Sequence, residues 1–240
     1  MTEQYIQERL TACGIFCDEV LAKKLNDYLA LLIEWNTRMN LTRIADEMEA
    51  VDAHFADSLM ALTIPGLIPD EGNLIDVGTG AGFPGMALAL AKPTLKVTLL
   101  DSLQKRLDFL AEVREKTGAD NVTLVHARAE DGARKPELRE AFDLATARAL
   151  APLPVLAEYL LPYVRVGGNA LCWKGPSLEE EMTAGRRAAY LLGGRTEEPI
   201  PVTIPGRDWK HALLPIRKIS ATPKAYPRRA GLPSQKPLAE

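Results

Sequence analysis

Apolar and polar positions divide this sequence into a helical first part and a second part in which short strands alternate with helices. Over the first 64 residues, apolar side chains recur every three or four positions, as on one face of a helix. The row of leucines from Leu21 to Leu32 predicts a helix of roughly 18 residues, with Asp18 as its N-cap. A second helix is predicted over residues 46–62, and the prolines and glycines of 65–72 indicate a linker.

From Asn73 onwards the pattern changes to short apolar runs that are typical of buried strands. These runs predict strands at 74–77, 97–101, 122–125, 142–146 and 169–173. Helices are predicted at 85–91, 103–117, 151–163 and 178–192. Strands that alternate with helices at this spacing predict an α/β fold with a parallel, doubly wound sheet.

Two more strand-like runs, 200–204 and 212–219, flank a Pro205-Gly206 turn. They predict an antiparallel hairpin that closes one edge of the sheet. We therefore expect three parts along the chain. They are an N-terminal helical segment packed on the core (1–64), the sheet domain (65–220) and a C-terminal tail (221–240).

The composition is that of an ordinary globular protein and excludes several classes of chain. Hydrophobic residues make up 47% and charged residues 25% of the 240 residues, which argues against disorder, collagen and coiled coil. Apolar runs are shorter than the roughly 18 residues of a membrane span, and the N-terminus does not resemble a secretory signal. Cys13, Cys17 and Cys172 are too few for a disulfide framework or a zinc site. We expect a cytoplasmic protein with reduced thiols and no metal or membrane partner.

The net charge of −3 conceals an uneven distribution along the chain. Residues 1–60 carry 5 basic and 11 acidic side chains, whereas residues 207–240 carry 8 basic and 2 acidic ones. The cations of the tail that lie around Tyr226 are Lys224, Arg228, Arg229 and Lys236. Cations beside an aromatic ring suit a phosphate backbone with an unstacked base, so these four are predicted RNA contacts. A tail that only adds solubility is the alternative.

The most informative motif is the run Asp76-Val77-Gly78-Thr79-Gly80-Ala81-Gly82-Phe83-Pro84-Gly85, between a predicted strand and a predicted helix. Glycines there allow a tight turn and a close approach of ligand to backbone. A dinucleotide fold has its third glycine where this chain has Phe83, which argues against a pyrophosphate site. A Gly-x-Gly-x-Gly turn preceded by an acidic residue resembles the class I S-adenosylmethionine-dependent methyltransferases. For the glycines alone, an ordinary strand–helix turn is the alternative.

Two further elements follow in the order that such a fold requires. Asp101 ends the second predicted strand, where a carboxylate can accept both hydroxyls of a cofactor ribose. Residues 126–131 follow the third predicted strand, where such folds place the loop that contacts adenine. Without the first two elements, this segment would be interpreted as a solvated polar loop.

Motifs over most of the chain resemble one family. They are Trp35-Asn36 with Asn40-Leu41-Thr42, His54-Phe55 with Asp57-Ser58-Leu59, the glycine run, Leu99 to Arg106, Arg148-Ala149, Trp173-Lys174-Gly175, and the ending from Lys224 to Leu238. On these residues the chain resembles the ribosomal RNA small-subunit methyltransferase G family, also named glucose-inhibited division protein B. The resemblance implies methyl transfer from S-adenosylmethionine to N7 of guanine 527 of 16S rRNA, with S-adenosylhomocysteine as the other product.

Carried over by position, the resemblance also implies the residues of the cofactor site. They are Asp76, Gly78, Gly80, Gly82, Phe83, Asp101, Ser102, Leu103, Ala129, Glu130 and Arg148. The implied partner is 16S rRNA, either free, in the small ribosomal subunit or in an assembly intermediate of that subunit. We expect the enzyme to act as a monomer.

The implied chemistry needs no general base, because N7 of neutral guanine already carries a lone pair. Catalysis then rests on proximity and on alignment of that lone pair with the sulfonium methyl. Arg148, past the fourth strand, is the predicted catalytic residue, with a hydrogen bond to guanine O6 or an ion pair with the cofactor carboxylate as its role. A surface arginine near the next helix is the alternative. Lys174 and His54 are predicted RNA contacts. The alternative for Lys174 is a lysine at the sheet edge without a function, and the alternative for His54 is a structural histidine.

Two other classes of function stay open at this point. A methyltransferase for another RNA, a protein or a small molecule would carry the same cofactor motif, but its basic tail and Lys174 would have no role. A non-catalytic cofactor-binding or assembly protein would transfer no methyl group at all. Replacing Arg228 and Arg229 tests the first class, because the loss of these tail cations should lower methylation only if RNA is the substrate. Measuring methyl transfer to RNA tests the second class.

Overall fold

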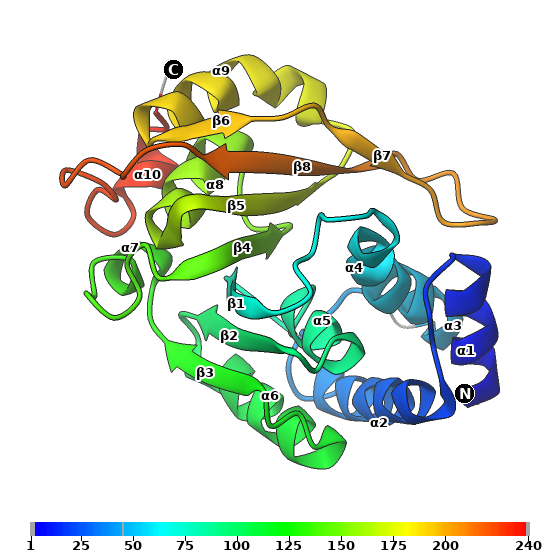
Figure 1. Ribbon diagram of the computed structural model, residues 1–240. Coiled ribbons are helices and arrows are strands. Elements are labelled where there is room, and N and C mark those ends of the chain that lie inside the picture. Colours follow the sequence, from blue (N-terminus) through cyan, green and yellow to red (C-terminus); the bar gives the residue numbers. More distant parts are fainter. Residues whose placement is uncertain (1–2, 45, 239–240) are drawn as a thin grey trace.

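One mixed sheet runs through the protein, and helices cover both of its faces (Figure 1). The computed structural model describes residues 3–44 and 46–238 of the 240. The parallel strands are β1 (Gly72–Val77), β2 (Leu95–Asp101), β3 (Val122–His126), β4 (Phe142–Arg148) and β5 (Val164–Lys174). Each of them overlaps a strand that the sequence predicts, so the predicted parallel α/β sheet is confirmed.

Three further strands extend the sheet in the antiparallel direction. They are β6 (Gly194–Thr196), β7 (Ile200–Val202) and β8 (His211–Lys218). The order in the sheet is β3-β2-β1-β4-β5-β8-β6, and β7 also pairs with β8. The predicted hairpin is therefore confirmed as a pairing, but β8 lies inside the sheet, between β5 and β6. β6 is absent from the predicted strands because three residues are too few to show an alternating pattern.

The order of the strands reverses next to β1. The chain passes from β1 outward to β3 and then returns to the other side of β1 as β4, where Asp76 lies opposite Thr146. In open α/β sheets, ligands bind at the carboxyl ends of the strands where the order reverses in this way. Residues directly after β1 and β4 therefore lie at the edge of the sheet where a ligand site is expected.

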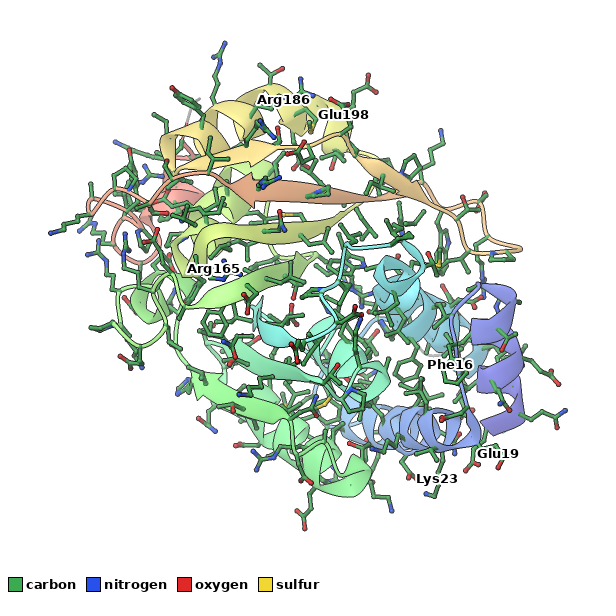
Figure 2. The ribbon with its side chains drawn as sticks, viewed as in Figure 1. Phe16, Glu19, Lys23, Arg165, Arg186 and Glu198 are labelled. Carbon is green, nitrogen blue, oxygen red and sulfur yellow. The ribbon has the colours of Figure 1, made fainter. Side chains whose placement is uncertain are left out.

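Helices from different parts of the chain cover the two faces (Figure 1). One face carries α5 (Gly85–Ala91) and α6 (Gln104–Thr117), and the other carries α7 (Ala129–Gly132), α8 (Leu153–Leu160) and α9 (Leu178–Leu191). The last four residues of β1 are buried, as expected for a strand covered on both faces. Charged side chains such as Lys23, Arg165 and Arg186 are exposed on the outside (Figure 2).

The N-terminal helices extend the layer that contains α5 and α6. They are α1 (Glu3–Ala12), α2 (Glu19–Asn36), α3 (Glu47–Ala50) and α4 (Asp57–Leu59). Asp18 is the N-cap of α2, as predicted, because its carboxylate accepts a hydrogen bond from Leu21 N at 2.8 Å. The leucines of α2 are buried against α5 and α6. The helices of the described residues lack the combination of length and hydropathy that a bilayer crossing requires.

The N-terminal segment differs in two places from the helices that the sequence predicts. Residues 37–44 form a loop, in which Asn36 Oδ1 accepts a hydrogen bond from Thr42 N at 3.0 Å. The second predicted helix is present but irregular, because a π-helical turn at Val51–Ala56 separates α3 from α4 and a 3-10 turn at Met60–Thr63 follows. Such π-turns occur often at functional sites, and His54 lies in this one.

The C-terminal segment does not extend away from the domain. A 3-10 turn (Leu161–Tyr163) follows α8. After β8 the chain returns past this turn and forms α10 (Leu232–Gln235) beside α8. Arg139 of the core donates hydrogen bonds to the carbonyl oxygens of Thr222 and Tyr226, at 3.0 and 2.9 Å. The segment predicted as a basic tail is therefore packed on the sheet domain.

Candidate functional site

The turn after β1 is built around the buried carboxylate of Asp76. Its Oδ2 accepts hydrogen bonds from Thr79 Oγ1 at 2.6 Å and from Gly85 N at 3.0 Å, and its Oδ1 accepts one from Thr146 Oγ1 at 2.7 Å. Burial raises the pKa of Asp76 to about 6, although these hydrogen bonds work against the shift. Asp76, predicted as a cofactor contact, thus lies beneath the turn and holds its two ends together.

The three glycines of the turn have positive φ, and two of them are also closely packed. Gly78, Gly80 and Gly82 have φ of 67°, 60° and 95°, a region that side chains rarely adopt. A Cβ on Gly78 would lie 2.6 Å from Leu150 Cδ1, and one on Gly82 would meet the Tyr28 hydroxyl. A Cβ on Gly80 would meet nothing closer than 4.0 Å, so the space above Gly80 is open. The turn therefore leaves room for a ligand against its backbone.

The carboxylate of Asp101 lies directly beside this open turn. Asp101 ends β2, and its Oδ2 accepts a hydrogen bond from Gly80 N at 2.9 Å. Its Oδ1 accepts one from Leu103 N at 2.9 Å. Ser102 and Leu103 follow at the surface, and the Leu103 side chain is 51% exposed, unusual for a leucine. The structure thus brings together the glycine turn, a carboxylate and an exposed apolar side chain, as a nucleoside site requires.

The loop after β3 supplies Ala129 and Glu130, which lie in α7. The carbonyl oxygen of Ala129 accepts a hydrogen bond from the Tyr163 hydroxyl at 2.7 Å. Glu130 is only 3% exposed, and its Oε1 accepts a hydrogen bond from Gly231 N at 2.7 Å. The sequence gives no sign of this contact, because the two residues are 101 positions apart.

Arg148 ends β4 and forms contacts with the N-terminal helices rather than with solvent. Its Nη1 donates hydrogen bonds to Ala53 O at 2.6 Å and to Asp57 Oδ2 at 2.8 Å, and Nη2 lies 3.3 Å from His54 Nδ1. Its guanidinium lies over the ring of Phe83, on which His54 is stacked at 4.7 Å between ring centroids. Arg148 thus connects the glycine turn to the N-terminal helices.

Arg148 and burial together shift the pKa values of the titratable groups around it. Burial lowers the pKa of His54 to about 4, and the positive charge of Arg148 adds to this effect, so this imidazole is neutral near pH 7. Burial acts to raise the pKa of Asp57, but hydrogen bonds from His211 and Arg148 outweigh it and hold the pKa below its usual value. The hydrogen bond to Asp57 raises the pKa of His211. Asp57 is therefore a buried carboxylate held between Arg148 and His211.

A cavity of about 360 Å³ opens on this cluster, within the usual size range of small-ligand sites. It is lined by Ala53, His54, Asp57, Arg148, Ala149, Trp173, Lys174, Gly175 and His211. Ala149 has a φ of 53°, a strained conformation for a residue with a side chain, and such strain is concentrated at functional sites. The cavity lies at the carboxyl ends of β4 and β5, at the edge where the fold places ligands.

Among the predicted RNA contacts, some are exposed and some are not. Lys224, Arg229 and Lys236 are exposed in the C-terminal segment. Lys174 and His54 line the cavity, but Lys174 is paired with Glu181 and its side chain is only 8% exposed. Arg228 departs most from the prediction, because it forms an ion pair with the buried carboxylate of Glu158. Its guanidinium is therefore less available to a phosphate in this structure than the three exposed cations.

Asp57, Trp173 and His211 line the cavity but are absent from the predicted site residues. Trp173 Nε1 donates to Asp57 O at 2.9 Å, and His211 Nδ1 lies 2.8 Å from Asp57 Oδ1. The available signal for Asp57 is its place three residues after His54 in one predicted helix and in the same family motif. His211 lies 154 positions from Asp57, and no pattern in the sequence connects them.

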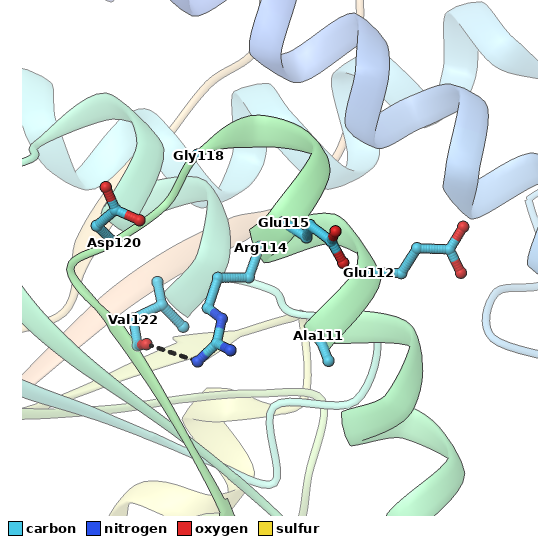
Figure 3. A pocket seen from close by; sticks show the side chains of 7 residues that line it. All are labelled: Ala111, Glu112, Arg114, Glu115, Gly118, Asp120 and Val122. Atoms are coloured by element: carbon cyan, nitrogen blue, oxygen red, sulfur yellow. Dashed lines mark hydrogen bonds between the residues drawn. The ribbon is translucent and has the colours of Figure 1, made fainter.

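A second cavity, of about 570 Å³, lies beside α6 and the start of β3 (Figure 3). Arg114 and Val122 line it, and Arg114 Nη1 donates a hydrogen bond to Val122 O at 3.5 Å. Val122 is the first residue of β3, so this cavity is at the amino ends of the strands. It is separate from the edge that carries the glycine turn and Arg148, and we assign it no role in the reaction.

Comparison with known proteins gives a consistent result over nearly the whole chain. A family model described as GidB, rRNA small subunit methyltransferase G, matches residues 21–203. A relative named ribosomal RNA small subunit methyltransferase G, from Alkaliphilus metalliredigens, is 48% identical over 225 residues, which cover 94% of each chain. One of the same name from Clostridium perfringens is 45% identical over 238 residues, which cover 98% of this chain and 99% of the relative.

Solved structures share the fold at low sequence identity. The 16S rRNA (adenine(1408)-N(1))-methyltransferase from Catenulisporales acidiphilia has a TM-score of 0.51 and 19% identity, over 63% of this chain and 89% of that chain. The structure of P. horikoshii TYW2 in complex with MeSAdo has a TM-score of 0.54 and 13% identity, over 69% of this chain and 62% of that chain. The predicted class I methyltransferase fold is confirmed.

Proposed function

This chain belongs to the rRNA small subunit methyltransferase G family, and on that premise we propose that it transfers the methyl group of S-adenosylmethionine to N7 of a guanine in 16S rRNA. One structural observation gives the main support for this proposal. The cavity at the ends of β4 and β5 shares a wall with the glycine turn, because Arg148, which lines the cavity, lies over Phe83 of the turn. A guanine in the cavity would therefore be next to the site of the methyl donor.

The residues of the turn fit S-adenosylmethionine. The open space at Gly80 and the exposed Leu103 beside Asp101 suit a nucleoside, with Asp101 as the acceptor for its ribose hydroxyls. Gly78, Gly82 and Phe83 shape the rest of the turn. Ser102, Ala129 and Glu130 are proposed for the adenine end. When bound, the cofactor supplies an electrophilic methyl group on a sulfonium.

The chain itself has to orient the guanine and exclude water. No base is needed, and His54, the imidazole against Phe83, is neutral near pH 7. Arg148 is held in place by Asp57 and by Ala53 O, so it presents a fixed positive charge at the wall between cavity and turn. We propose two alternative roles for Arg148, a hydrogen bond to guanine O6 or an ion pair with the cofactor carboxylate. The measured cofactor affinity of an Arg148 variant separates them.

We propose that the RNA approaches across the exposed cations of the C-terminal segment. Lys224, Arg229 and Lys236 are available for phosphates, whereas Lys174 and His54 lie in the cavity itself. The proposed substrate is 16S rRNA, free, in the small subunit or in an assembly intermediate, and the proposed setting is the cytoplasm, with the enzyme as a monomer.

The proposal is tested by mapping 7-methylguanosine in 16S rRNA. The protein is incubated with labelled S-adenosylmethionine and either unmodified 16S rRNA or small subunits that lack the modification, and the RNA is reduced and cleaved with aniline. We expect label in the RNA and a single new cleavage position that depends on the protein. Transfer of label without a guanine-specific cleavage would overturn the N7 assignment, and no transfer to either substrate would overturn the enzymatic role.

A further inference from the structure

Arg228 is the one predicted RNA contact of the C-terminal segment that is committed to a partner inside the protein. Glu158 lies in α8 with a fully buried side chain. Its carboxylate accepts hydrogen bonds from Arg228 N at 2.7 Å, from Nε at 3.0 Å and from Nη2 at 2.6 Å. A buried carboxylate without such a partner is strongly unfavourable, so α8 and Arg228 are tightly coupled.

The same segment contacts the cofactor site three residues later. Gly231 N donates to Glu130 Oε1 at 2.7 Å, and Glu130 is almost completely buried. Gly231 has a φ of 82°, which only glycine adopts easily. Beyond this contact, Ser234 Oγ lies 2.7 Å from the Tyr159 hydroxyl. The backbone from Arg228 to Ser234 is thus anchored on α8 at both ends, and Gly231 reaches Glu130 between the two anchors.

Further contacts hold the approach to this segment. Arg134 donates a hydrogen bond to Pro227 O, directly before Arg228. Arg139 binds the carbonyl oxygens of Tyr226 and Thr222. Cations of the sheet domain therefore donate to carbonyl oxygens of the C-terminal segment, while a buried carboxylate of α8 binds a cation of that segment. The charge of Arg228 is used in an internal contact and not as part of an outward-facing patch.

We propose that the Arg228–Glu158 pair positions the cofactor site, through Gly231 and Glu130. A hydrogen bond to Oε1 fixes the rotation of the planar Glu130 carboxylate and therefore the place of its other oxygen. The pair holds the Gly231 N–H in reach of Glu130, so an ordered C-terminal segment completes the adenine end of the site before any RNA is present. The inference rests on the proposed function for the assignment of Glu130 to the cofactor. Arg228 and Glu158 are positioning residues, because neither is placed in contact with substrate.

The chain offers a matched pair of variants for the test. Arg228→Ala and Arg229→Ala each remove one arginine from adjacent positions, but only Arg228 is paired with Glu158. Affinity for S-adenosylmethionine is measured by calorimetry without RNA. Arg228→Ala is expected to weaken binding by about fivefold or more, within the usual range of coupling between sites, and Arg229→Ala is expected to leave it unchanged. Equal affinity in the Arg228→Ala and wild-type proteins, or an equal loss in the two variants, overturns the proposal.

A second probe tests whether the effect is at the adenine end. Methylthioadenosine carries the adenine and ribose but lacks the amino-acid end of the cofactor. The Arg228→Ala variant is expected to lose affinity for methylthioadenosine by the same factor as for S-adenosylmethionine. A loss restricted to S-adenosylmethionine would place the effect at the amino-acid end of the site and overturn the proposed path through Glu130.

The wild-type protein supplies a test that does not depend on a variant folding. If the segment supports cofactor binding, the cofactor must stabilise the segment by the same factor. Hydrogen exchange of the amides of residues 228–235 is expected to slow when S-adenosylmethionine is added. Unchanged exchange there, while the amides of the glycine turn become protected, would overturn the inference. Failure of the wild-type protein to bind the cofactor at all would instead contradict the proposed function.

Discussion

The guanidinium carbon of Arg148 lies 5.3 Å from the centroid of the Phe83 ring. Arg148 ends β4 and Phe83 follows β1, and the two residues meet at the edge of the sheet where the strand order reverses. The contact joins the glycine turn to a cavity on the other side of Arg148. We propose that donor and acceptor meet beside this side chain, because N7 of the guanine and the sulfonium methyl must be in direct contact and in line for the transfer.

Replacement of this arginine is expected to abolish the reaction. Arg148→Ala removes the charge at the shared wall and leaves Asp57 with one cationic partner fewer. We expect turnover on 16S rRNA to fall by at least about 100-fold, and we expect a loss of stability of a few kcal/mol, because a buried carboxylate loses an ion pair. Steady-state methylation and thermal unfolding measure the two effects. Retained turnover would contradict the assignment, and a cofactor affinity that also falls would favour the ion pair with the cofactor carboxylate.

A larger residue in the glycine turn is expected to prevent cofactor binding. Gly78→Val places a Cβ 2.6 Å from Leu150 Cδ1 in a backbone conformation with φ of 67°. We expect the heat of S-adenosylmethionine binding to disappear in calorimetry. Gly66→Ala is the matched control, because Gly66 has a φ of 74° but no atom within 4 Å of a new Cβ. It costs a similar strain of roughly 1–2 kcal/mol and should bind the cofactor normally.

The low pKa of His54 predicts a dependence of stability on pH. Burial, helped by Arg148, lowers this pKa from 6.5 to about 4. Between these values the unfolded chain binds more protons than the folded protein, so this histidine makes stability rise with pH across the window. We expect His54→Gln to flatten the curve there, by at most about 1.4 kcal/mol per pH unit.

Denaturant unfolding of both proteins at several pH values tests this expectation. Asp76 has a raised pKa of about 6 and acts in the opposite direction, because the folded protein then binds the extra proton. Its effect is present in both proteins and cancels in the difference between them. An unchanged difference across the window would show that His54 is not buried as a neutral imidazole.

An exposed cation of the C-terminal segment should affect RNA binding alone. Arg229→Ala is expected to weaken binding to 16S rRNA and to reduce the slope of log affinity against log salt by about 1, the effect of one lost phosphate contact. Binding measured over a range of salt concentrations gives the slope. If the segment only adds solubility, the slope will match that of the wild-type protein.

The N-terminal helices are expected to affect the cofactor site through Tyr28. Its side chain is fully buried, its hydroxyl donates a hydrogen bond to Ala81 O in the glycine turn, and its ring is stacked on Phe83 at 5.2 Å. Tyr28→Phe keeps the ring but leaves the carbonyl oxygen without this donor. We expect a loss of about 1–3 kcal/mol in stability, measured by denaturant unfolding, together with weaker cofactor binding. A change in stability without a change in cofactor affinity would mean that Tyr28 only packs.

Apolar spacing and the glycine run were enough to locate the parallel strands, most of the helices and the glycine turn. These features are local: apolar spacing defines each strand and helix, and three glycines close together mark backbone with positive φ. The residues at the ends of β1, β2 and β4 were predictable for the same reason, since parallel strands present their carboxyl ends at one edge. The reaction was predicted from the motifs that the chain shares with its family.

Which charged groups meet depends on how distant segments of the chain pack together. The partners of Arg148 and Arg228, Asp57 and Glu158, are 91 and 70 positions away in the sequence. No local pattern encodes such a pair, because the groups meet only where the N-terminal helices contact the end of β4 and where the C-terminal segment packs on α8. Burial then makes each pair strong, since a carboxylate removed from water must keep its cation. That is why Arg228, predicted from charge as an RNA contact, is instead paired with a buried carboxylate and has a side chain that is only 21% exposed.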